Sequence, residues 1–257
     1  MDRSALCDFH PLSTGLDQPV LALIQELSAT PAPPPAACER DAFLALLCGL
    51  PALRKTPGLP GMDALGPDYF TTLPRCAGEA DAALTRQHLE QVFGITDRDS
   101  LIRFCSQELR VQDNWSDFVS FWEGHPVFGL EELQDGARDF FQVARDFSAQ
   151  FYELVGPRGF LAWDISECLG QLRAAYACGI LDRAGFDEMA AYWLDCAGAF
   201  QNWREYAVSL VCGGTYWSFR TGSRMDQLQE NQDLWLRLVR RLLEDPHAWG
   251  SGLWYQG

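Results

Sequence analysis

Six acidic side chains on predicted helices are the first candidates for chemistry: Asp164, Glu167, Asp187, Glu188, Asp195 and Glu205. Two carboxylates that face each other across a groove can act as general acid and base, with one pKa raised by burial. No nucleophile, metal cluster or cofactor motif accompanies these residues. Because the chain holds 35 acidic residues, most are expected to face solvent. The sequence therefore leaves enzyme activity open and favours a protein that is not an enzyme.

Other catalytic patterns are missing from the sequence. A Walker-type phosphate loop needs a lysine at a fixed place, and Lys55 is the only lysine; neither GxGxxG nor GxSxG is present. Cys7 and His10 have a metal-like spacing, but a second pair of ligands is lacking among the four histidines. We therefore expect no cofactor and no metal site.

A Trp–Asp pair, Trp163 and Asp164, begins the stretch "AWDISECLGQLRAAYACGILDRAGF". On a helical wheel the apolar residues of 160–178 form one stripe, and Trp163 lies nearly opposite it beside Asp164, Glu167 and Gln171. This pattern predicts a central helix that is covered on two sides. Asp164 then either caps the helix or pairs with an arginine while Trp163 packs, or the polar residues line a groove between helices.

A second informative helix is predicted over 202–219, in "FQNWREYAVSLVCGGTYWSF". Two adjacent glycines inside a helix each cost about 1 kcal/mol against alanine, so a close neighbour should offset them. That neighbour is either another helix or a ligand seated in the Gly213–Gly214 notch. The candidate binding residues of both helices are Trp163, Asp164, Glu167, Gln171, Trp203, Tyr206, Gly213, Gly214 and Trp217.

The elements that must position these residues are nearly all helical. Strand-like alternation is almost absent, and the spacing of apolar residues predicts an all-α fold of eight to ten helices. Residues 1–37 are expected to form an N-terminal helix (17–27) and the proline-rich connector "TPAPPPAA", and residues 38–257 one helical domain. The other predicted helices span 41–49, 81–93, 97–109, 113–122, 129–156, 160–178, 182–199, 202–219 and 225–243, with a Pro- and Gly-rich loop over 51–74.

Composition restricts the class of partner. The net charge of −15 and pI of about 4.6 argue against nucleic acid and anionic membranes as partners. The nine cysteines are odd in number and lie in apolar helical stretches, which is typical of free thiols in a reducing compartment. We expect a cytoplasmic protein with a protein partner of unknown identity; the oligomeric state stays open.

The run "WDISECLGQLRAAYACGILDRAGFDEMAAYW" with "FQNWREYAVSLVCGGTYW" resembles the bacterial domain-of-unknown-function family 1266. The likeness covers residues 81–219 well and 42–67 loosely, although Phe93 stands where a tryptophan is more usual, and Glu167 and Cys168 where a basic residue often follows. The resemblance implies a helical fold and carries no established activity. Its motif positions are Trp163, Asp164, Tyr176, Gly179, Glu188, Trp203, Tyr206, Gly213 or Gly214, and Trp217.

Two functions remain open from the sequence. The first is a cytoplasmic protein-binding module, adaptor- or immunity-like, which the acidic charge and the missing catalytic motifs favour. The second is an enzyme or small-ligand binder that uses Asp164, Glu167 and Trp203 around the Gly213–Gly214 notch; it predicts a concave polar pocket there.

Overall fold

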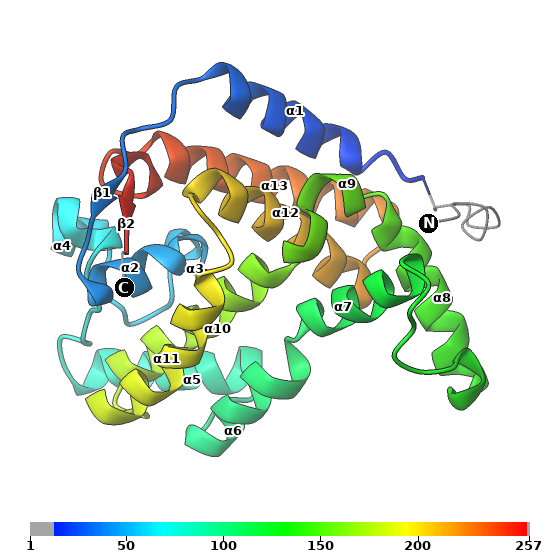
Figure 1. Cartoon of the computed structure of the whole chain (residues 1–257). Coiled ribbons are helices and arrows are strands. Elements are labelled where there is room, and N and C mark those ends of the chain that lie inside the picture. The colour runs from blue at the N-terminus through cyan, green and yellow to red at the C-terminus, as the bar shows by residue number, and fades with distance from the viewer. Residues whose placement is uncertain (1–12, 256–257) are drawn as a thin grey trace.

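The computed structural model describes residues 13–255, which fold almost wholly into α-helices (Figure 1). The predicted all-α class is confirmed. The longer helices are α1 (Asp17–Ala29), α2 (Arg40–Leu47), α5 (Glu79–Phe93), α7 (Val111–Trp122), α8 (Asp135–Ala149), α10 (Leu161–Ala177), α11 (Arg183–Ala197), α12 (Trp203–Arg220) and α13 (Met225–Glu244). Shorter helical turns raise the number of elements above the eight to ten expected: α3 (Gly49–Arg54), α4 (Met62–Leu65), η2 (Gly66–Phe70), α6 (Arg98–Arg103), η3 (Phe104–Glu108), η4 (Leu130–Glu132), α9 (Tyr152–Val155), η5 (Gly156–Arg158) and η6 (Trp249–Ser251). None of the helices within 13–255 is long and apolar enough to cross a membrane.

α10 runs through the centre of the molecule (Figure 1). All of its side chains are buried except Leu161 and Tyr176. α12 packs on one side of it, α11 and α5 pack on another, and α2, α3 and α7 complete the enclosure. The predicted two-sided covering of this helix is confirmed, because Trp163 and the apolar stripe opposite it are both buried.

The helices predicted to begin at residues 97, 182 and 202 do so, because caps fix these ends. Asp97, Asp182 and Asn202 each begin a helix by accepting backbone N–H groups of the first turn with a side-chain oxygen. Gly94 ends α5 in the left-handed conformation at φ 64°, which glycine adopts without strain.

Two predicted boundaries were wrong. The single helix expected over 129–156 is divided into η4, α8 and α9, because Leu133 and Gln134 are extended and the chain turns again at Phe151 to bury that ring. The loop expected from residue 51 begins later, since Pro51 lies in the first turn of α3. Proline is tolerated there because its missing N–H would have no helical acceptor.

The N-terminal segment is joined to the C-terminal end of the chain. α1 lies across α12, and its Val20 and Leu23 are fully buried in the main core. The proline-rich connector (residues 30–37) then leads to β1 (Ala36–Ala37), which pairs in parallel with β2 (Leu253–Trp254). The apolar face of α1 thus belongs to the core of the helical domain.

The cysteines from residue 13 to residue 255 are all free thiols. Several lie in the core, and burial raises the pKa of the Cys48 and Cys212 thiols, which keeps them protonated. Cys7 and His10, the pair with metal-like spacing, lie outside the described residues. Among the residues that are described, no group of three His, Cys, Asp or Glu side chains could hold a metal ion.

Candidate functional site

The nine predicted binding residues do not form one site. All of them are buried except Trp217, which is half-buried. Trp163, Glu167 and Trp217 line one cleft, whereas Trp203 lines a separate cavity at the other end of α12. The others, including Gln171 at 5% exposed, belong to the helix packing.

Asp164 joins two helices instead of capping its own. Its two carboxylate oxygens accept the backbone N–H groups of Val111 at 3.1 Å and Gln112 at 3.0 Å, at the start of α7. Burial raises the pKa of Asp164 to about 7, although these hydrogen bonds and Arg110 act to lower it. Because the side chain is 0% exposed, Asp164 does not line a polar groove in this structure, and of the two alternatives left open the structural one fits this residue.

The Gly213–Gly214 notch is filled by a side chain of the protein. A Cβ added to Gly213 would lie 2.5 Å from the Cβ of Trp163, and one added to Gly214 would lie 2.5 Å from Cζ3 of the same ring. The glycines therefore permit the close approach of α10 and α12, which is the first of the two alternatives drawn from the sequence, and a ligand has no space in this notch. Tyr206, seven residues earlier in α12, is also buried and donates its hydroxyl to the carbonyl of Leu47 at 2.9 Å.

Trp163 and Glu167 instead line a cleft of about 470 Å³ between α10, η3, α12 and α13, which we call the Trp163–Glu167 cleft. The Glu167 carboxylate is 3% exposed and forms an ion pair with Arg54 from α3. The Arg54 guanidinium also lies 5.6 Å from the ring centroid of Trp235, a cation–π contact. The pairing with Arg54 compensates the buried charge of Glu167.

Two polar groups of this cleft lack partners. The indole N–H groups of Trp163 and Trp235 are buried, and neither has a hydrogen-bond acceptor within residues 13–255. Buried donors are normally satisfied, so an acceptor that reached these two N–H groups would stabilise the fold around the cleft. One wall is η3, a π-helical turn, and such turns are frequent at functional sites.

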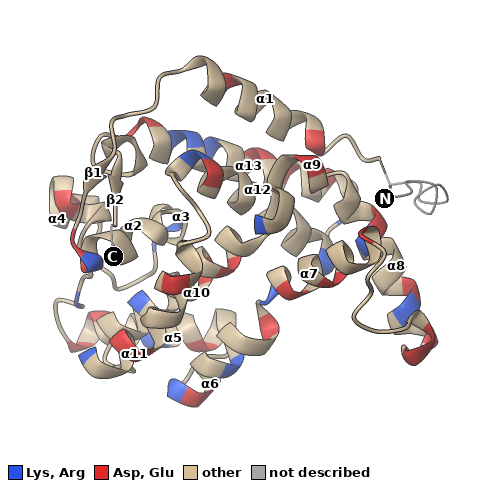
Figure 2. Ribbon diagram, viewed as in Figure 1, with Lys and Arg blue, Asp and Glu red and all other residues tan. Residues whose placement is uncertain are grey.

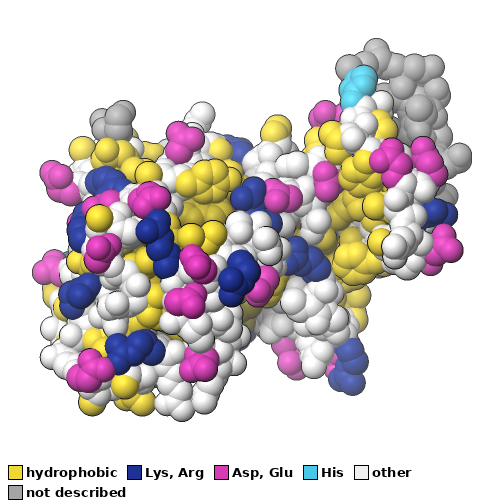
Figure 3. All heavy atoms as spheres, turned by 90° about the horizontal axis from the view of Figure 1, so that it is seen from below, with side chains coloured by type: hydrophobic (Ala, Val, Ile, Leu, Met, Phe, Trp, Pro, Cys, Tyr) yellow, Lys and Arg dark blue, Asp and Glu magenta, His cyan; other side chains and the backbone are white. Residues whose placement is uncertain are grey.

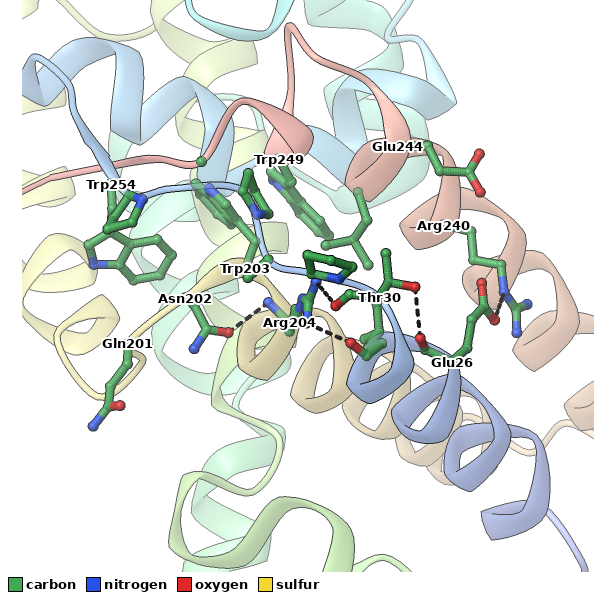
Figure 4. A pocket seen from close by; sticks show the side chains of 17 residues that line it. Glu26, Thr30, Gln201, Asn202, Trp203, Arg204, Arg240, Glu244, Trp249 and Trp254 are labelled. Atoms are coloured by element: carbon green, nitrogen blue, oxygen red, sulfur yellow. Dashed lines mark hydrogen bonds and ion pairs between the residues drawn. The ribbon is translucent and has the colours of Figure 1, made fainter.

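A second cavity, the connector cavity, lies beneath the proline-rich connector (Figure 4). It has a volume of about 480 Å³ between the C-terminal end of α1, the start of α12 and the end of α13. Its aromatic wall consists of Trp203, Trp249 and Trp254, and the rings of Trp203 and Trp249 are parallel, with centroids 5.3 Å apart and 2° between the planes. Pro31 and Pro33 of the connector are among the residues opposite.

Charged residues stand at one side of this cavity (Figure 4). Arg204 donates to the carbonyl oxygens of Leu27 at 2.5 Å and Thr30 at 2.8 Å, which holds the last turn of α1. Arg240 forms an ion pair with Glu26 at 2.9 Å. Both arginines therefore already have protein acceptors.

A third feature is the α7–α8 arm (residues 111–149), which projects from the body of the molecule (Figure 1). A groove of about 300 Å³ separates its two helices. Hydrophobic side chains gather on the arm, with acidic side chains beside them (Figure 3), and acidic residues recur along both helices (Figure 2). The groove is lined by residues of both helices and of α12, among them Asp117, Phe118, Phe128, Phe140, Phe141 and Tyr216.

These features define the class of the chain: an all-α protein whose cavities lie between helices and whose described residues hold no metal-ligand cluster. Residues 88–254 match the family described as "Protein of unknown function (DUF1266)". The chain belongs to this family, and the resemblance noted from the sequence is confirmed. Comparison with curated proteins found no match, and comparison with solved structures found none either.

Sequence reasoning missed several residues of these sites. Arg54 lay in a stretch predicted as loop, and Trp235 is one apolar residue of an ordinary amphipathic helix. Trp249 and Trp254 stand in the C-terminal segment, to which we assigned no site. A usable signal was present in that segment, because two tryptophans five residues apart outside a predicted helix need an apolar surface to cover them.

Proposed function

We propose that this chain is a non-enzymatic protein-binding module whose α7–α8 arm binds a basic amphipathic helix of a partner protein. The observation that carries the proposal is the arm groove, where aromatic side chains, the exposed Phe140 among them, lie with a carboxylate that has no ion-pair partner within residues 13–255. Helix-in-groove recognition uses this combination of an apolar surface and charge complementarity.

The apolar part of the surface lies on α8. Phe140 is 46% exposed and Val143 is 49% exposed, and their spacing of three residues places them on one helix face. Phe140 stacks on Phe219 of α12, with ring centroids 6.4 Å apart. The neighbouring Phe141 packs against Phe118 and Phe128, with ring centroids 5.3 Å apart in both pairs. The exposed side chains therefore rest on a firm aromatic base, and clustered exposure of this kind is typical of interaction sites.

The charge of the arm selects a basic partner. Residues 111–149 contain eight Asp or Glu residues and two arginines, a net charge of −6 with His125 neutral. Asp117 lines the groove and has no ion-pair partner in the described part of the chain. Burial, and then the nearby Asp113, raise the pKa of the Asp117 carboxyl, which a lysine or arginine of a partner would reverse.

The first experiment compares two synthetic helical peptides by fluorescence anisotropy, one with leucines flanked by lysines and one with the lysines replaced by glutamates. We expect saturable binding of the lysine peptide only. Phe140→Asp should weaken it about tenfold or more, since the change places a charge in the apolar contact.

The matched control is Leu84→Asp on α5, where Leu84 is 50% exposed and far along the chain from the arm. Both variants add one negative charge, so purely electrostatic attraction would strengthen the binding of both. Equal affinities in the wild type, Phe140→Asp and Leu84→Asp would overturn the proposal.

A second candidate function, small-ligand binding or catalysis, is favoured by the unpartnered indole N–H groups of the Trp163–Glu167 cleft. Native mass spectrometry of the chain purified from its own host tests it: a bound mass of a few hundred daltons that is lost in Glu167→Gln would support this function. A bound mass retained in Glu167→Gln would place the ligand elsewhere, and an unliganded chain would count against this candidate.

A further inference from the structure

We propose that the connector cavity is a binding site for an uncharged, apolar small molecule with a flat ring. The site is separate from the α7–α8 arm, and it is built from two parts of the chain that lie far apart in sequence: the connector near residue 30 and the segment that follows α13.

The walls of the cavity are aromatic and aliphatic. Trp203 donates its indole N–H to the carbonyl of Leu253 at 2.8 Å, and Trp249 donates to the carbonyl of Leu46 at 2.8 Å. Both indoles are therefore held in fixed positions with their donors used. Trp203 is 4% exposed and Trp249 is 1% exposed, so they form the base of the cavity, and the half-buried Trp254 is the more accessible ring. Trp254 stands edge-on to Trp203 at 4.8 Å between centroids, an arrangement that favours a further flat ring.

The size of the cavity suits a small molecule. Its volume of about 480 Å³ lies in the range of sites that enclose small organic ligands, which are mostly apolar with a few polar groups at one side. Leu27 and Leu243 add aliphatic walls from α1 and α13. Filling this space would remove apolar surface from water on both the ligand and the protein.

The charges at the cavity favour an uncharged ligand. Arg204 and Arg240 are opposed by Glu26 and Glu244, so the formal charges of the lining cancel. The Arg204 guanidinium is bound to two carbonyl oxygens, and Arg240 is bound to Glu26. A ligand ion would have to break one of these contacts or remain uncompensated in an apolar space, which is costly.

The connector is the wall that can admit a ligand. Prolines have no backbone N–H, so the connector makes few hydrogen bonds to the helices beneath it. It is held near its ends, by Arg204 at Thr30 and by the N–H of Ala36, which donates to the carbonyl of Gly252 at 3.0 Å. Between these points Pro31, Ala32 and Pro33 are exposed on their outer side. Displacing them breaks few contacts and opens the cavity.

The test uses the full chain and the uncharged dye N-phenyl-1-naphthylamine, whose fluorescence rises in apolar surroundings. We expect saturable binding of one dye per chain. Ala32 lines the cavity, so Ala32→Trp places a large side chain there and should weaken dye binding by about tenfold or more. The control Ala29→Trp adds the same side chain at the exposed end of α1, outside the cavity, and should leave the affinity unchanged. Circular dichroism confirms that both variants are folded.

Two further measurements decide the place and the class of ligand. The related anionic dye 8-anilinonaphthalene-1-sulfonate should bind about tenfold more weakly, because its sulfonate has no free cation to meet. Equal binding of both dyes would overturn the uncharged class. Dye binding that is lost in Phe140→Asp and retained in Ala32→Trp would place the dye on the arm and overturn the site, as would the absence of saturable binding.

Discussion

Asp164 shows at the scale of single residues how a core can hold a carboxylate by giving it backbone donors. The side chain is 0% exposed, and its two oxygens accept the first free N–H groups of α7, where the helix dipole also favours a negative charge. Burial nevertheless raises its pKa to about 7. The cost of removing the charged carboxylate from water thus exceeds the stabilisation of the charged form by its hydrogen bonds, and the pKa lies near neutral pH.

This raised pKa predicts a dependence of stability on pH. The folded state holds the proton up to about pH 7, whereas the unfolded chain releases it near 3.8, so ionisation favours unfolding between these values. As pH rises from 4 to 7, the free energy of unfolding of the wild type should fall relative to Asp164→Asn, by on the order of 1 to 4 kcal/mol. Urea denaturation at several pH values measures the difference.

The control for this prediction is Asp139→Asn, which changes an exposed carboxylate of α8. Its free energy of unfolding should change with pH in the same way as that of the wild type. A wild type and an Asp164→Asn variant with parallel pH profiles would show that Asp164 does not titrate in this range.

At the scale of secondary-structure elements, α1 and the proline-rich connector are attached to the domain by contacts of different kinds. The apolar face of α1 is buried on α12, whereas its C-terminal turn depends on Arg204, whose guanidinium satisfies two carbonyl oxygens that no helical N–H can reach. Hydrogen bonds from a charged donor are stronger than neutral ones. Arg204 therefore determines how firmly the connector is held over its cavity.

Arg204→Ala should loosen this end of α1 without unfolding the domain. We expect hydrogen exchange of the amides at the C-terminal turn of α1 and in the connector to speed up by about tenfold, since hydrogen bonds to a charged group contribute roughly 1.5 to 3 kcal/mol each. Exchange in α10 should be unchanged. Arg240→Ala, which removes only a partly exposed ion pair with Glu26, should have a smaller effect. Equal effects of the two variants would contradict the assigned role of Arg204.

At the scale of the whole molecule, the net charge of −15 acts against the compact state. The ion pairs of the described residues act in the opposite direction, but most of them are well exposed, and exposed pairs contribute little. The mutual repulsion of acidic residues should therefore dominate the response to salt.

Raising sodium chloride from about 20 mM to about 200 mM should increase the free energy of unfolding by on the order of 1 kcal/mol, because shortening the Debye length screens the repulsion. Thermal denaturation at constant pH measures this change. A decrease in stability on adding salt would show that the ion pairs, such as Arg183 with Asp41, outweigh the net charge.

The arm and the connector cavity are also properties of the whole molecule, because each needs neighbours that are distant in sequence. Tyr216 of α12 closes one side of the arm groove, and Trp249 and Trp254 face a connector more than 200 residues earlier. No single helix carries either surface by itself.

The sequence alone determined the features that depend on neighbours along the chain. The helical class follows from the spacing of apolar residues, and Asp97, Asp182, Asn202 and Gly94 fixed helix ends because a cap interacts with residues two to four positions away. The Trp–Asp motif and the paired glycines were also readable, and the family to which they pointed is the one that the chain matches.

The tertiary structure decided what those residues do. The donors to Asp164 lie more than fifty positions before it, Trp163 rather than a ligand occupies the glycine notch, and Arg54 reaches Glu167 from another helix. A periodic pattern identifies the buried face of a helix, but it does not specify which helix opposes that face. The neighbouring helix is determined by the packing of the whole core. The hydrophobic effect is not directional, and only side chains of complementary shape fill the interior.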